Sequence, residues 1–102
     1  MKIAIACDHA GPSLKAKVVA HLKDKGIEVA DFGTDDTRPV DYPDYALKVA
    51  QAVASGQADL GILICGTGIG MSICANKVKG IRCALCSDTF SAHATRQHND
   101  AN

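Results

Sequence analysis

The sequence predicts a single α/β domain in which right-handed β–α–β units build a parallel sheet. Short apolar segments alternate along the whole chain with amphipathic segments of about 10–15 residues, which is the pattern of strands joined by crossover helices. Glycine or proline lies at most of the boundaries between these segments, where strands and helices end. The length of 102 residues is that of one domain.

The apolar segments predict four strands, at 2–7, 27–32, 60–65 and 81–86. Helices are expected in four places: from Pro12 to the glycine at 26, from Pro43 to the glycine at 56, from the glycine turn at 66–70 to about 80, and from a Ser87 or Asp88 cap to about 98.

In the first helix, Leu14, Val18 and Leu22 recur every four residues, so this face is expected to pack on the sheet. Lys15, Lys23 and Lys25 are expected to point into solvent.

The order of elements predicts that the chain continues beyond its last residue in the source protein. It ends at Asn102 after a helix, where an α/β fold ordinarily adds another strand. The last edge of a four-stranded parallel sheet would otherwise be uncovered. We therefore expect residues 1–102 to be a single domain truncated at its C-terminus.

Composition excludes several classes of partner. Lysine and arginine total 11, as do aspartate and glutamate, so the sequence favours neither a nucleic acid nor a membrane surface. No apolar run approaches the ~20 residues of a membrane span. The five cysteines are an odd number inside apolar segments, which indicates free thiols in a reducing compartment such as the cytoplasm.

The sharpest motif is Cys65 followed by the turn Gly66-Thr67-Gly68-Ile69-Gly70. Glycines ahead of a helix let backbone N–H groups close on a phosphate or an enediolate oxygen. A thiol at a helix N-terminus is expected to have a lowered pKa, so it can serve as a base or nucleophile. The alternatives are a tight connection with no ligand and a buried structural cysteine.

Three other phosphate-binding loops do not fit this turn. A tyrosine-phosphatase loop needs an arginine six positions after its cysteine, and that position is Met71. The glycine spacing also differs from the dinucleotide fingerprint, and the lysine of a Walker loop is absent.

Polar residues at other strand and helix ends join this site as candidates. Asp8 and His9 end the first strand, and ligands bind at the carboxyl ends of parallel strands. Their alternative roles are a helix cap and a solvent-exposed imidazole. His98 with Asn99 ends the fourth helix, and Tyr42 offers a hydroxyl from a loop; taken alone, both signals are weak.

The C-x-x-C motif formed by Cys83 and Cys86 is read as packing. On a strand the two side chains would point to opposite faces, whereas a zinc or disulfide pair needs them on the same side. No second ligand pair follows in the sequence.

Together these motifs resemble the ribose-5-phosphate isomerase B family, which also includes galactose-6-phosphate isomerase subunits. The matching stretches span the whole chain: CDHAG at 7–11, DYPDYA at 41–46, ILICGTGIGMSICANK at 62–77, GIR at 80–82 and RQHNDAN at 96–102. The resemblance implies a Rossmann-like sheet, a homodimer with active sites near the interface, and neither metal nor organic cofactor. It also implies interconversion of ribose 5-phosphate and ribulose 5-phosphate through an enediolate, a step of the pentose phosphate pathway.

The resemblance implies a role for each candidate residue. Cys65 would move the proton between carbons, and Thr67 with the backbone amides of residues 66–70 would stabilise the enediolate. His98 with Asp8 would assist opening of the furanose ring. His9 would help hold the phosphate, while Asn99 and Tyr42 would contact the sugar.

The chain departs from the family at its phosphate clamp. The main phosphate-binding arginines of the family lie in a segment beyond residue 102, together with a fifth strand, a helix and dimer contacts. None of Arg38, Arg82 and Arg96 matches them, so weak or absent activity is expected from this chain unless another chain supplies those parts.

Three alternatives remain open at this stage. The first is an isomerase of a six-carbon sugar phosphate, allose 6-phosphate or galactose 6-phosphate. The second is a non-catalytic domain that binds a phosphosugar. A thiol-redox protein is the third and the most distant.

Overall fold

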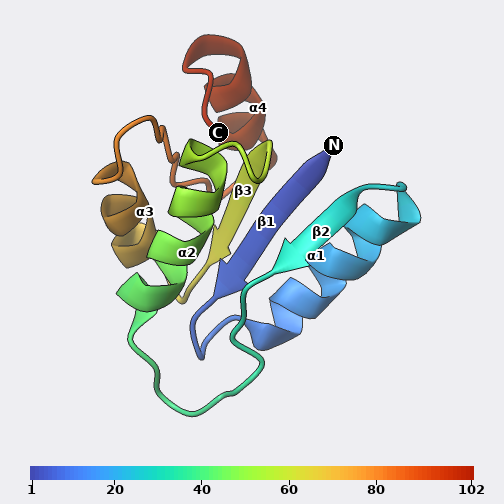
Figure 1. Ribbon diagram of the computed structural model, residues 1–102, viewed down its shortest axis with the longest axis vertical. Coiled ribbons are helices and arrows are strands. Elements are labelled where there is room, and N and C mark those ends of the chain that lie inside the picture. The colour runs from blue at the N-terminus through green and yellow to red at the C-terminus, as the bar shows by residue number, and fades with distance from the viewer.

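The computed structural model describes all of residues 1–102 and contains a three-stranded parallel sheet with four helices. The strands lie in the order β2-β1-β3, so the first strand is central (Figure 1). The elements are, in chain order, β1 (Lys2–Cys7), α1 (Pro12–Asp24), β2 (Glu28–Asp31), α2 (Tyr42–Ala54), β3 (Leu60–Ile64), α3 (Ile69–Asn76) and α4 (Thr89–His98). None of the helices has the length and apolar character needed to cross a membrane.

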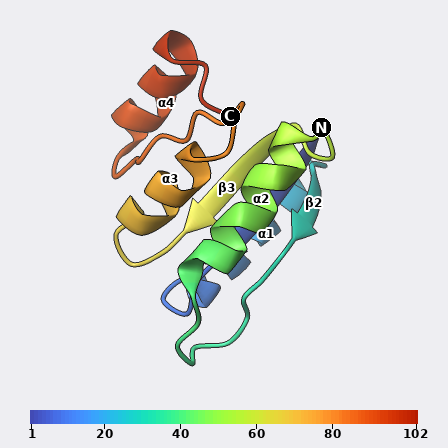
Figure 2. The same cartoon turned by 60° about the vertical axis from the view of Figure 1, so that its left-hand side comes forward.

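The sheet has a helix on each face. In Figure 2, α2 lies in front of the strands and α1 behind them. The core between α2 and the sheet consists of small side chains: Ala4, Ala6, Val49, Ala52 and Ala58. Small residues bring the helix close to the strands, as Gly61 shows: a Cβ atom added there would lie 2.7 Å from Val49 Cγ1. The strands and α2 thus form a closely packed support for the loops at their carboxyl ends.

The predicted α/β class is confirmed, but the predicted fourth strand at 81–86 is wrong. That segment has no regular structure. The edge of β3 is instead occupied by Asn102, whose carbonyl accepts from Gly61 N at 2.8 Å. Asn102 N in turn donates to Arg82 O at 3.0 Å. Asn102 therefore lies between the edge of β3 and the segment that was expected to form the fourth strand.

The predicted orientation of α1 is also partly wrong. Leu22 is buried as expected, but Leu14 is 53% exposed and Lys15 is only 1% exposed. The ammonium of Lys15 lies 2.8 Å from Asp31 Oδ1 and 2.8 Å from Asp35 Oδ1. These two carboxylates belong to β2 and the loop after it, so a tertiary ion pair overrides the amphipathic pattern of the helix.

Other predicted boundaries agree closely with the structure. β1 occupies the expected residues, and α2 begins one residue before Pro43. Asp88 caps α4, because its Oδ1 accepts from Ser91 N at 2.6 Å. α3 ends at Asn76, earlier than the expected 80.

Candidate active site

The turn after β3 carries a sulfur atom and several backbone donors within a few residues. Gly68 N donates to Cys65 Sγ at 3.0 Å, and Ile69 N donates to Thr67 Oγ1 at 3.2 Å. Gly68 has φ = 79°, in the left-handed region, which glycine adopts at little cost. This conformation bends the chain back, so that an N–H at the start of α3 points at the thiol of Cys65.

Further donors in this turn have no acceptor within the chain. The amides of Gly66, Thr67, Gly70 and Met71 make no hydrogen bond to another group of the protein. The first N–H groups of a helix are free in this way by geometry, and they carry its positive end. An oxyanion beside Cys65 would therefore meet several hydrogen-bond donors.

Cys65 is half-buried and lines a cavity of about 590 Å³. Gly66, Thr67 and Gly68 line the same cavity. Residues 82–87 and part of α4 also line this cavity. The chain around Ser87 thus shares a cavity with Cys65, as a loop and not as the end of a strand.

Asp8 lies next to the glycine turn, and the following residue, His9, accepts from Val40 N at 3.3 Å through Nδ1. Asp8 N donates to Ile64 O at 3.1 Å, and its buried carboxylate accepts from Ala10 N at 2.9 Å. A Cβ atom added to Gly66 would lie 3.9 Å from Ala10 Cβ. The carboxylate of Asp8 therefore closes a local turn, and the carboxyl ends of β1 and β3 converge as parallel strands require.

Tyr42 also reaches the glycine turn. A Cβ atom added to Gly70 would lie 2.8 Å from Cε1 and 2.8 Å from Cζ of the Tyr42 ring, and 3.1 Å from its Oη. Tyr42 is 41% exposed as a residue, and its ring lies beside the start of α3. The absence of a side chain on Gly70 is what allows this approach.

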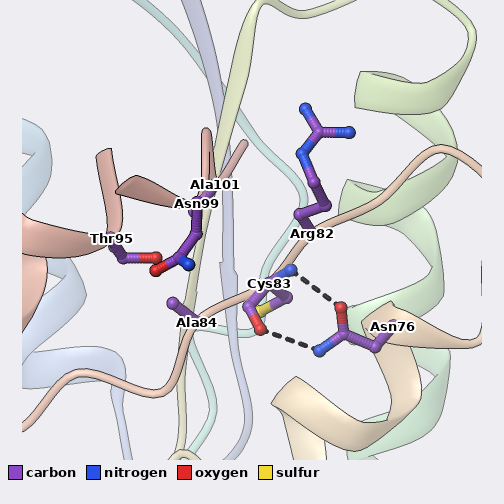
Figure 3. Close-up of a pocket in the computed structure, with 7 residues that line it drawn as sticks. All are labelled: Asn76, Arg82, Cys83, Ala84, Thr95, Asn99 and Ala101. Carbon is purple, nitrogen blue, oxygen red and sulfur yellow. Dashed lines mark hydrogen bonds between the residues drawn. The ribbon is translucent and has the colours of Figure 1, made fainter. Parts of the chain in front are cut away.

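The structure places Asn99 in a second cavity and His98 in neither. Asn99 lines a pocket of about 260 Å³, where its amide lies beside Thr95 and faces Ala84 (Figure 3). Two hydrogen bonds join the Asn76 side chain to the backbone of Cys83 on the other side of this pocket: Asn76 Nδ2 donates to Cys83 O, and Cys83 N donates to Asn76 Oδ1. His98 lines neither cavity.

The end of α4 lies near the amino end of β3. Asn102, a few residues after His98, bonds to Gly61, and both ribbon views show the C-terminus beside that end of the strand (Figures 1 and 2). Cys65 follows the carboxyl end, four residues further, or about 13 Å along an extended chain. His98 itself does not line the cavity of Cys65, although Thr95, Arg96 and Ala101 of the same part of the chain do.

Sequence reasoning missed Leu85 and Arg82. An added Cβ on Gly68 would meet Leu85 Cδ1 at 2.5 Å, so Leu85 closes over the glycine turn. Arg82 lines both cavities and pairs with Asp100 at 3.3 Å. No local pattern marks either residue, because each reaches its place through a segment without regular structure.

Cys83 and Cys86 do not lie on opposite faces of a strand, as predicted, because their segment is not a strand. Burial raises the pKa of the Cys83 thiol, and the nearby Cys86 raises it further. A raised pKa keeps the thiol protonated, and the protonated form is a poor nucleophile for disulfide exchange. The thiol-redox alternative is therefore not supported by this pair. No three His, Cys, Asp or Glu side chains lie close enough together to hold a metal ion.

Comparison with known proteins places these features in a family. Residues 3–102 match the family described as Ribose/Galactose Isomerase. The chain is 57% identical to ribose-5-phosphate isomerase B of Escherichia coli over 101 residues, which cover 99% of this chain and 68% of that protein.

Solved structures agree with this match. The ribose-5-phosphate isomerase B of Clostridium thermocellum superposes with a TM-score of 0.98 at 57% identity, covering 100% of this chain and 69% of that one. The ribose 5-phosphate isomerase of Thermotoga maritima superposes with a TM-score of 0.96 at 58% identity, covering 99% and 70%.

Proposed function

Because the chain belongs to the ribose/galactose isomerase family, we propose that it is an aldose–ketose isomerase that interconverts ribose 5-phosphate and ribulose 5-phosphate. The observation that carries this proposal is the turn at 65–70, where the Cys65 thiol and the residues of two free backbone N–H groups, Gly66 and Thr67, line one cavity. Isomerisation of this kind needs a base beside a carbon-bound proton and donors for the oxyanion that develops. Both are supplied by one rigid segment.

The proposed reaction moves two protons, one between carbons and one between oxygens. In the open-chain aldose, the thiolate of Cys65 takes the proton from C2, the C2–H electron pair becomes the C1–C2 double bond, and the carbonyl pair of C1 moves onto O1 to give an enediolate. The thiol then returns its proton to C1 while the hydroxyl proton of O2 passes to O1, so that C2 becomes the carbonyl carbon of the ketose. No electrons leave the sugar, so the route requires no redox cofactor.

The free amides of Gly66, Thr67, Gly70 and Met71 are the proposed donors to the enediolate oxygens. Loss of one donor of this type costs about 2.7–4 kcal/mol in transition-state stabilisation. Thr67 Oγ1 is engaged with Ile69 N, so its hydroxyl hydrogen is free to join them. We also assign to this turn the substrate contacts of Gly68 and Ile69.

The remaining polar residues are proposed to handle the ring and the ends of the substrate. His9 is proposed to help hold the phosphate, and Tyr42 to contact the sugar. His98 with Asp8 would open the furanose ring, and Asn99 would contact the sugar. Because the structure does not bring His98 into the cavity that contains Cys65, we propose that these groups meet across the interface of a homodimer.

Residues 1–102 are proposed to act as one sugar-phosphate isomerase domain. All five cysteines are free, which suits a reducing compartment, and we propose the cytoplasm as its location.

The first test is solvent-deuterium incorporation at C2 of ribose 5-phosphate, followed by NMR. The protein is compared with Cys65→Ala and with Cys74→Ala, a matched control on α3 whose half-buried thiol lines neither cavity. We expect exchange in the parent protein and in the control, and none in Cys65→Ala. Exchange that survives in Cys65→Ala would show that another group is the base.

A six-carbon sugar phosphate is the second candidate substrate, because the family description includes galactose isomerases. Allose 6-phosphate and galactose 6-phosphate in the same exchange assay decide between the two chain lengths. Ligand binding without exchange of any of the three substrates would support the non-catalytic alternative.

A further inference from the structure

Lys15 is a charged residue in an unusual place. Its side chain is 2% exposed, and its ammonium lies 2.8 Å from one oxygen of Asp31 and 2.8 Å from one oxygen of Asp35. Removing an ammonium from water is costly and is tolerated where partners compensate for it. The pair of carboxylates does so, and they belong to a different part of the chain from the helix that carries Lys15.

The two carboxylates hold the segment that follows β2. Asp31 Oδ1 also accepts from Gly33 N at 2.9 Å. The segment is then tied to the end of β1 by three bonds: Cys7 N donates to Gly33 O at 2.7 Å, Thr34 N donates to Cys7 O at 2.9 Å, and Cys7 Sγ donates to Thr34 O at 3.2 Å. Residues 31–35 are therefore fixed against α1 on one side and against β1 on the other.

The same segment continues along the carboxyl end of the sheet to α2 (Figure 1). On its way, Val40 N donates to His9 Nδ1 at 3.3 Å. A ring nitrogen that accepts a hydrogen bond carries no hydrogen, so the neutral imidazole must carry its hydrogen on Nε2. The backbone of the segment thereby selects one of the two tautomers of His9.

We propose that Lys15, through Asp31 and Asp35, positions the segment 31–40 so that the Val40 amide holds His9 as the Nε2–H tautomer. In this state His9 offers a hydrogen-bond donor to an oxygen of the substrate. Lys15 is a positioning residue in this proposal, since it acts through the segment and does not touch the substrate. That the His9 Nε2–H group binds the substrate rests on the proposed function. The choice of tautomer and the positioning of residues 31–40 by Lys15 rest only on the contacts above.

The tautomer is measured directly by long-range ¹H–¹⁵N correlation on protein labelled at histidine, with the His9 signals assigned by their loss in His9→Gln. We expect a pure Nε2–H tautomer in the parent protein. In Lys15→Met, which keeps the length of the side chain without its charge, we expect a mixture of both tautomers. The amide of Val40 should also exchange with solvent at least tenfold faster. Lys17→Met, an exposed position on the same helix, should leave both signals unchanged.

Asp35→Asn is a second test in case Lys15→Met does not fold. The Asp35 side chain is 88% exposed, so this substitution leaves no buried group without a partner, because Lys15 keeps Asp31. It should shift both signals in the same direction as Lys15→Met, and Lys15→Arg should restore them in part. In the isomerase assay, Lys15→Met and Asp35→Asn should each raise KM for ribose 5-phosphate severalfold while kcat changes less than twofold.

The outcomes separate the two proposals. An unchanged tautomer and an unchanged Val40 amide in folded Lys15→Met and Asp35→Asn would overturn the positioning role, whatever the activity. The expected NMR changes in a protein that catalyses no exchange would support the positioning role and count against the isomerase.

Discussion

Gly68 is the residue at which a single added methyl group should disturb the active-site turn most, and the cost can be worked out in two parts. Its φ of 79° lies in the left-handed region, where a residue with a side chain pays roughly 1–2 kcal/mol. The added Cβ would also lie 2.5 Å from Leu85 Cδ1. Leu85 is 48% exposed and can turn away, so this overlap should cost about 1 kcal/mol, at the low end for overpacking. Gly68→Ala is thus expected to lower the free energy of unfolding by about 2–3 kcal/mol.

The assay is urea unfolding followed by circular dichroism, with Gly26→Ala as the matched control. Gly26 has φ = 74° and nothing within 4 Å of an added Cβ, so this variant measures the backbone cost alone. The difference between the two variants is the overlap with Leu85, and it should disappear when both are made in a Leu85→Ala background. Because Gly68 N donates to Cys65 Sγ, deuterium exchange at C2 should fall in Gly68→Ala and remain unchanged in Gly26→Ala.

Equal destabilisation by the two glycine variants would refute the contact between Gly68 and Leu85. Full exchange activity in Gly68→Ala would refute the claim that the precise shape of this turn matters for the base.

Three further perturbations test other parts of the structure. Gly61→Ala should lower the free energy of unfolding by about 1–3 kcal/mol, because its Cβ would lie 2.7 Å from Val49 Cγ1. Adding Val49→Ala to the same chain should recover part of this loss. If urea unfolding shows that the costs of the two substitutions simply add, the contact is contradicted. Hydrogen bonds from the backbone N–H and the side chain of Ser91 lower the pKa of Asp88 below its ordinary value, so the stability that this carboxylate contributes is fully present above about pH 3.9 and is lost as pH falls through the lower pKa of the folded state. The difference in unfolding free energy between the protein and Asp88→Ala should therefore shrink between about pH 5 and pH 2. A constant difference would count against the cap. Burial alone would lower the pKa of Lys15, but the hydrogen bonds and charges of its two aspartates raise it on balance. The stability that its ammonium contributes is therefore fully present below about pH 10.4 and is lost as pH rises through the higher pKa of the folded state. The unfolding free energies of the protein and of Lys15→Met should converge above that pH, and a difference that persists would show that Lys15 acts through packing and not through charge.

The sequence was most informative where structure depends on neighbouring residues. The strand at 2–7, the Asp88 cap and the turn at 66–70 each follow from the properties of a few adjacent residues, and each is confirmed. The convergence of Asp8 with that turn followed from one topological rule about parallel strands.

Prediction was wrong where distant segments compete. The segment at 81–86 is apolar enough for a strand, but whether it pairs depends on what else reaches the edge of β3, and Asn102 takes that place. Lys15 looked like a solvent-facing residue because its partners Asp31 and Asp35 lie 16 and 20 residues away. The separation of His98 from Cys65 could not be predicted either, since it depends on where α4 docks.

The central position of β1 has a consequence for the timing of synthesis. β1 is the most deeply buried strand, yet one of its two neighbours, β3, begins more than fifty residues later: Lys2 N donates to a side-chain oxygen of Asp59, across a separation of 57 residues. At about 5–20 residues per second, the ribosome completes this stretch in roughly 3 to 11 s. Both edges of β1 are open until β2 has been made, and one edge stays open until β3 has been made, so the most buried strand of the sheet is the one that waits longest for its partners.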